Sequence, residues 1–125
     1  GECAGAVVDQ AEFMLEDADR LNFEASLALD EEHHTQAAKL SHQAVTKAAD
    51  GILFTRGLLL SDKYDTVKEF RSHFYDTAVF WKPFAENFFR TEQEGIDGVT
   101  PERARQRVEE ATLFIEQAQT VYSQS

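Results

Sequence analysis

The clearest structural signal of the chain lies in residues 4–28, AGAVVDQAEFMLEDADRLNFEASLA, where alanine recurs every seven residues. The repeating positions are Ala4, Ala11, Ala18 and Ala25, interleaved with Val7, Met14, Leu21 and Ala28. Apolar residues at alternating spacings of three and four predict one helix with a single buried stripe, from about Ala4 to Asp30. Because alanine side chains are small, the backbone of a neighbouring helix can approach closely. The pattern predicts a tightly packed helical bundle.

Two further segments carry a similar alanine stripe. The polar cluster at residues 30–35 ends the first periodicity, and a second helix is expected to run to about Leu59, with a buried face of Ala37, Leu40, Ala44, Ala48 and Ile52. Gly51 lies inside this helix, where glycine costs about 1 kcal/mol relative to alanine, so it indicates close approach of another helix. Thr100-Pro101-Glu102 is typical of a helix start. The helix that follows is expected to reach about Tyr122, with a stripe of Ala104, Val108, Ala111, Ile115, Ala118 and Tyr122.

Shorter elements are expected between these helices. Asp65 or Thr66 is placed to cap a third helix, which should end or kink before Pro83 and whose apolar face would be Val67, Phe70, Phe74 and Ala78. Pro83 to Arg90 predicts a fourth helix, and Thr91 to Val99 a loop. Alternating patterns typical of strands are absent from the sequence. We therefore predict an all-α, antiparallel, up-and-down bundle of four to five helices in a single domain, residues 1–125.

Composition restricts the expected partners. The 125 residues carry a formal net charge of −11, which disfavours nucleic acid and anionic membranes as general partners. The sequence has no run of 18 apolar residues. The single cysteine, Cys3, is typical of a reducing compartment, so a cytoplasmic location is expected. Because the chain starts at Gly1 without methionine, we expect it to be a piece of a longer protein.

Motifs for catalysis or metal binding are weak. Glu31-x-x-His34 has the helical spacing of a di-iron ligand pair, but such a site needs the pair twice and only Glu69 with His73, at a different spacing, comes near. Cys3 has no histidine nearby in the sequence, and the glycines match no phosphate-binding loop. No catalytic residue and no metal site are predicted. Arg103, Arg105 and Arg107 crowd one helix start, where we interpret them as a solvated face neutralised by nearby glutamates: Glu102, Glu109 and Glu110.

Aromatic residues are concentrated in one region. Eight of the fourteen lie in residues 70–89, and adjacent aromatic pairs on a helix point in diverging directions. Some of them should therefore line a pocket or an interface, although an interpretation as core alone is equally open. The candidate ligand or interface residues in this region are Arg71, His73, Phe74, Tyr75, Phe80, Trp81, Phe84 and Phe88.

Residues 36–53, QAAKLSHQAVTKAADGIL, together with the Val67-x-x-Phe70 helix and the final alanine-striped helix, resemble HEPN domains. The resemblance covers about Phe13 to Tyr122. It implies an all-α, often homodimeric bundle. Many HEPN domains are ribonucleases with an arginine followed four to six residues later by a histidine, a motif that this chain lacks: its nearest arrangement is Arg71-Ser72-His73. Other members are non-catalytic modules that bind nucleotides or partner proteins.

The opening Gly1-Glu2-Cys3-Ala4-Gly5 is similar to the junction that precedes a HEPN-like tail on some sulfite or nitrite reductase-like proteins. The resemblance implies that any siroheme and iron–sulfur cluster belong to the rest of such a protein. We therefore expect a non-catalytic accessory module that dimerises, contacts the rest of its own polypeptide or binds a ligand, in a larger cytoplasmic protein. One alternative is a divergent ribonuclease or nucleotide-binding protein using His42, Lys47, Arg71 and His73. Another is an antitoxin-like module that binds a partner through the acidic first helix.

Overall fold

The computed structural model describes the backbone of residues 2–56 and 65–124 and the side chains of residues 10–56 and 65–124. Its elements are α1 (Glu2–Asp30), α2 (His34–Phe54), α3 (Thr66–Phe70), the π-helical turn η1 (Arg71–Tyr75), α4 (Lys82–Glu94) and α5 (Pro101–Ser123). No strand occurs in these described stretches. The predicted all-α helical bundle is confirmed.

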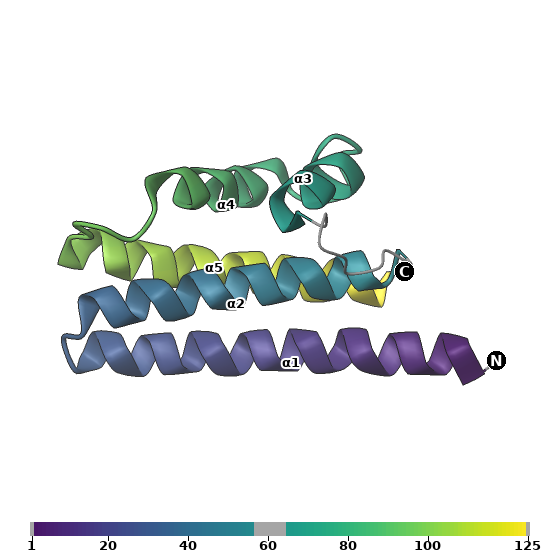
Figure 1. The fold of residues 1–125 in the computed structure, drawn as a ribbon, viewed down its shortest axis with the longest axis horizontal. Helices are drawn as coiled ribbons and strands as arrows, with labels where there is room; N and C mark the ends of the chain where they lie inside the picture. Colours follow the sequence, from purple (N-terminus) through teal and green to yellow (C-terminus); the bar gives the residue numbers. More distant parts are fainter. Residues whose placement is uncertain (1, 57–64, 125) are drawn as a thin grey trace.

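The three long helices lie side by side, and the shorter ones form a second layer (Figure 1). α2 packs against both α1 and α5, while α3 and α4 cover α2 and α5 on the side opposite α1. The chain direction alternates through α1, α2, α4 and α5, so that α2 and α5 point the same way. α1 and α2 are therefore antiparallel, whereas the neighbouring helices α2 and α5 are parallel.

Alanines line the contact between α1 and α2, which we call the alanine seam: Ala11, Ala18, Ala25, Ala37, Ala44 and Ala48, all with 0% exposure. Gly51 shows how close the two backbones are. A β-carbon at Gly51 would lie 3.3 Å from Cβ of Met14 and 3.5 Å from the carbonyl oxygen of Ala11. The predicted close approach at Gly51 is confirmed. The predicted seam residues Ala4 and Val7 lie outside the described side chains.

Phenylalanines fill the space between the two layers, in a group that we call the phenylalanine cluster: Phe70, Phe74, Phe80, Phe88, Phe89 and Phe114. Phe70 is its hub, with ring centroids of the other five between 5.0 and 6.1 Å away. All six are buried, and the first three are at most 1% exposed. The middle of the sequence therefore joins the bundle through large rings rather than through small side chains.

The predicted helix starts are accurate. Asp65 accepts a hydrogen bond from the Lys68 amide at 3.1 Å, and Thr100 accepts one from the Arg103 amide at 3.1 Å. Both side chains satisfy donors that a helix N-terminus leaves free. The polar cluster between the first two helices forms a turn, in which the His33 amide donates to Ala28 at 2.8 Å.

Three predictions about the extent of the helices and their faces need correction. The second helix was expected to reach about Leu59, but α2 ends at Phe54. Residues 57–59 of the predicted helix lie outside the described residues. Ala78 is not on a helix face: it has a positive φ of 60° and is exposed, because the chain turns back after η1 to bury Phe80. α4 is longer than predicted and includes residues 91–94, so the loop starts only at Gly95, where φ is 71°.

Candidate functional site

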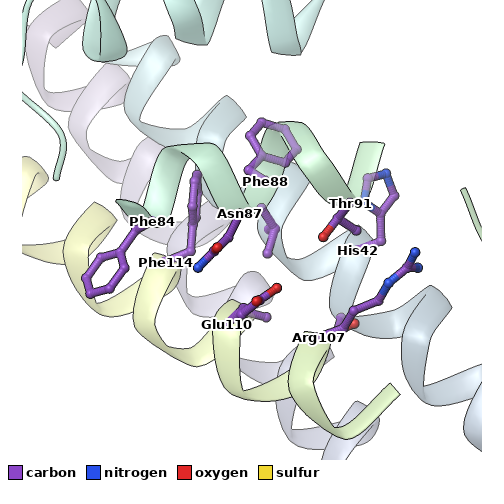
Figure 2. Close-up of a pocket in the computed structure, with 11 residues that line it drawn as sticks. His42, Phe84, Asn87, Phe88, Thr91, Arg107, Glu110 and Phe114 are labelled. Atoms are coloured by element: carbon purple, nitrogen blue, oxygen red, sulfur yellow. The ribbon is translucent and has the colours of Figure 1, made fainter. Parts of the chain in front are cut away.

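A hollow lies where α2, α4 and α5 meet, and two polar side chains, His42 and Arg107, lie near one end of it (Figure 2). Its cavity volume is about 20 Å³, and the space measured out into open solvent is about 290 Å³. Three rings, Phe84, Phe88 and Phe114, form its apolar walls together with Val45 and Ala111. Arg107 reaches from α5 toward His42 on α2. We call this the His42–Arg107 pocket.

A second, wider hollow of about 300 Å³ adjoins the pocket and shares His42, Thr91 and Arg107 with it. Lys39, Gln43 and Glu92 line this outer space. The combined shape has an apolar inner end and a polar mouth. A mostly apolar hollow with a few converging polar groups is the usual form of a ligand site.

Arg107 is the most unusual residue of the pocket, since its charged side chain is only 3% exposed. One terminal nitrogen contacts the Gly95 carbonyl and lies 3.4 Å from Glu94. Its Nε has no hydrogen-bond partner among the described protein atoms. An unsatisfied buried donor is costly, by about 1 to 3 kcal/mol and more for a charged group, so this N–H needs an explanation.

His42 presents the second unsatisfied atom. Its Nε2 lies 2.9 Å from a carboxylate oxygen of Glu92, whereas its Nδ1 is buried without a partner among the described residues. Because a carboxylate only accepts hydrogen bonds, we assign the proton of the neutral ring to Nε2. Nδ1 of that ring is then an acceptor. The pocket therefore combines one free donor with one free acceptor.

Ion pairs beside the pocket leave Arg107 weakly compensated. Glu94 accepts two hydrogen bonds from Arg103, at 2.9 and 3.1 Å, while Glu110 contacts Arg90 at 2.6 Å and Arg103 at 3.3 Å. Three guanidinium groups thus share two carboxylates. Because Arg103 engages both oxygens of Glu94, the same carboxylate reaches Arg107 only at the longer distance.

The pKa values of this cluster follow from the same contacts. The hydrogen bond from Arg103 lowers the pKa of Glu94, an effect that burial opposes and Arg107 reinforces. Burial alone would lower the pKa of Arg103, but the hydrogen bond with Glu94 and the charge of Glu110 outweigh it, so that this pKa is raised. Glu94 therefore stays ionised and holds the start of α5 against the end of α4. The predicted pairing occurs for Arg103, through Glu94 and Glu110, and for Arg107, through Glu94. The predicted solvated face is wrong for Arg107, whose side chain the packing of α5 against α2 and the end of α4 buries.

The structure separates the candidate residues predicted from the sequence. His42, Phe84 and Phe88 line the pocket, and Lys47 lines a neighbouring groove with His42, 3.8 Å from Asp17. Phe74 and Phe80 are core residues at 0% and 1% exposure, so they present no surface to a ligand or an interface.

The other candidates lie on the second layer, outside the lining of the pocket. The Arg71 guanidinium stacks 4.0 Å from the ring of Phe89, and His73 lies 3.5 Å from Glu69 in its own turn. Tyr75 donates to Glu86 at 3.3 Å, and Trp81 is 59% exposed. The four residues of the ribonuclease alternative therefore divide between the groove (His42 and Lys47) and the second layer (Arg71 and His73).

Sequence reasoning missed Arg107 as a pocket residue, although a signal was present. Arg107, Phe114 and Val121 are seven residues apart in α5, and the other two are buried apolar residues. A charged residue at an apolar heptad position indicates a buried charge with a specific role. Asn87, Thr91 and Glu110 carried no comparable signal, because only the packing of α4 on α5 brings them to the pocket.

No three His, Cys, Asp or Glu side chains gather among the described residues in a way that could hold a metal ion. No helix of the described stretches has both the length and the apolar character needed to cross a bilayer.

Comparison with known proteins does not extend these observations: no protein-family model matches the chain, and no curated protein matches it significantly.

Proposed function

We propose that this chain is a non-catalytic binding module whose ligand site is the His42–Arg107 pocket. The observation that carries the proposal is the buried Arg107 side chain: its Nε and the Nδ1 of His42, which lines the same pocket, both lack a partner among the described residues. A ligand that supplies an acceptor to one atom and a donor to the other satisfies both.

The pocket walls restrict the ligand further. Phe84, Phe88 and Phe114 offer ring faces and edges, which favour a planar apolar body. A carboxamide on such a body presents an acceptor oxygen and a donor N–H on one edge. The ligand class is therefore a small planar molecule with an amide-like edge.

The wider context stays a prediction. The HEPN-like identity, homodimerisation and attachment to a larger cytoplasmic protein, with a sulfite or nitrite reductase-like protein as the suggested host, rest on sequence resemblance alone. So do a nucleotide ligand and the siroheme and iron–sulfur cluster expected in the rest of that host. The proposal for the pocket needs none of them.

Benzamide is a suitable first probe, titrated into the 125-residue chain while the Arg107 Nε–H resonance is followed by NMR. We expect this resonance to shift with saturation, and benzoate, which lacks the donor, to bind more weakly. Arg107→Gln should weaken benzamide binding by about tenfold or more, since hydrogen bonds to charged groups contribute about 1.5 to 3 kcal/mol. Arg105→Gln, at an exposed position of the same helix, is the matched control and should bind normally.

His42→Ala provides a second variant in case Arg107→Gln does not fold, as judged by circular dichroism. It should also weaken benzamide binding, because the acceptor is lost. An Arg107 resonance that benzamide and related amides leave unmoved contradicts the ligand class. RNA cleavage by the wild-type chain that disappears in His42→Ala or Arg71→Ala contradicts the non-catalytic assignment.

A further inference from the structure

The outer face of α1 exposes three large apolar side chains. Phe13, Phe23 and Leu27 are 59%, 64% and 45% exposed. Single exposed apolar residues are common on soluble proteins, but a group of them on one helix marks an interaction surface.

The three side chains share one side of the helix. Leu27 follows Phe13 by two heptads, about 21 Å along the helix, and Phe23 lies one turn before Leu27. The exposed side chains of Glu16 and Arg20 lie on the same side between Phe13 and Phe23, so the stripe is apolar at its two ends and charged in its middle. Ala18 and Ala25, on the opposite side, are fully buried. Figure 1 shows α1 at the edge of the bundle, with α2 and α5 on one side of it and the second layer beyond them. The stripe therefore faces away from the rest of the domain.

The surroundings of the stripe are acidic. Residues 10–30 contain one basic residue, Arg20, and six carboxylates: Glu12, Glu16, Asp17, Asp19, Glu24 and Asp30. Arg20 is held by two of them, at 2.6 Å from Asp17 and 2.9 Å from Glu24. Its charge is therefore already compensated within the helix, and the surroundings of the three apolar side chains remain negative.

We propose that the stripe formed by Phe13, Phe23 and Leu27 docks a basic amphipathic helix of another protein. The apolar face of such a helix would cover the three side chains, and lysine or arginine residues along its edges would pair with the carboxylates. A second copy of this chain fits poorly, because two α1 faces would bring their acidic rims together and each chain carries a net charge of −11.

An amphipathic peptide of leucine and lysine, about five helical turns long, is the probe, and its binding to the 125-residue chain is measured by fluorescence anisotropy. Phe23→Ser and Leu27→Ser should each weaken binding by about tenfold, since each removes one large apolar contact. Val79→Ser is the matched control, because Val79 has the same 45% exposure as Leu27 but lies between η1 and α4. It should leave the affinity unchanged.

Charge provides an independent arm of the test. Glu16→Lys and Glu24→Lys should weaken binding, and the affinity for the wild-type chain should fall as salt concentration rises. Equal binding of a peptide with the same composition in scrambled order would show general charge attraction and overturn the proposal. Full affinity in Leu27→Ser overturns it too, as does self-association of the chain that Leu27→Ser abolishes. The pocket variants play no part in this test, so the two proposals fail independently.

Discussion

The alanine seam and the phenylalanine cluster are both buried, but they hold the chain together in opposite ways. Along the seam, the smallest side chains bring two backbones close over the length of α1 and α2, which are adjacent in the sequence. In the cluster, six large rings from α3, η1, the segment before α4, α4 and α5 meet around Phe70. In the seam, added side-chain atoms would clash with the neighbouring backbone, whereas in the cluster the removal of ring atoms would leave a cavity. Burial alone therefore does not say which substitution a position tolerates.

The largest effect is expected from Phe70→Ala. Phe70 contacts five other rings, so its removal leaves a cavity that the surrounding helices cannot close, at a cost of about 3 to 5 kcal/mol in the free energy of unfolding. Urea unfolding followed by circular dichroism measures this change. Phe23→Ala is the control, because Phe23 is 64% exposed, and it should change the stability by less than about 0.5 kcal/mol. Equal costs for the two variants would show that the cluster is not a packed core.

An intermediate effect is expected from Ala18→Leu in the seam. Ala18 is fully buried between closely spaced helices, so the three added carbons must displace a backbone, at a cost of about 1 to 3 kcal/mol. The same unfolding measurement applies. Gln106→Leu adds an apolar side chain at an exposed position of α5 and should be nearly neutral. A stabilised Ala18→Leu variant would mean that the seam has free space, and the contrast with the cluster would then disappear.

The smallest effect is expected from Gly51→Ala, which tests how rigid the seam is. Alanine improves helix propensity by about 1 kcal/mol, but its β-carbon would lie 3.3 Å from Cβ of Met14, closer than ordinary contact. We expect the two terms to cancel, so that the midpoint of thermal unfolding hardly moves. A stabilisation approaching the full gain in propensity would show that α1 yields easily at this point.

Local patterns were sufficient to predict part of the fold and of the site. The heptads of residues 4–28 predicted α1 and its buried face, while Asp65 and Thr100 predicted helix starts that the structure contains. These features depend on residues within one or two helical turns of each other. His42, Phe84 and Phe88 were also among the predicted site residues, and all three line the pocket.

Other features depend on contacts that no local pattern contains. Ala78 leaves the expected helix because burial of Phe80 outweighs its continuation. The last turn of α4 extends beyond the predicted end, and its Glu94 pairs with Arg103 of α5. Arg107 becomes a pocket residue only when the end of α4 closes over it.

The order of amino acids alone specified the all-α class, the boundaries of α1 and α5 and the close contact at Gly51, because periodicity and capping act between near neighbours along a helix. The presence of two unsatisfied polar atoms in one pocket, and the division of the aromatic residues into core and surface, arise from the packing of α4 on α2 and α5. That packing joins residues more than seventy positions apart, and its outcome depends on which rings and charged side chains pack together in the same space.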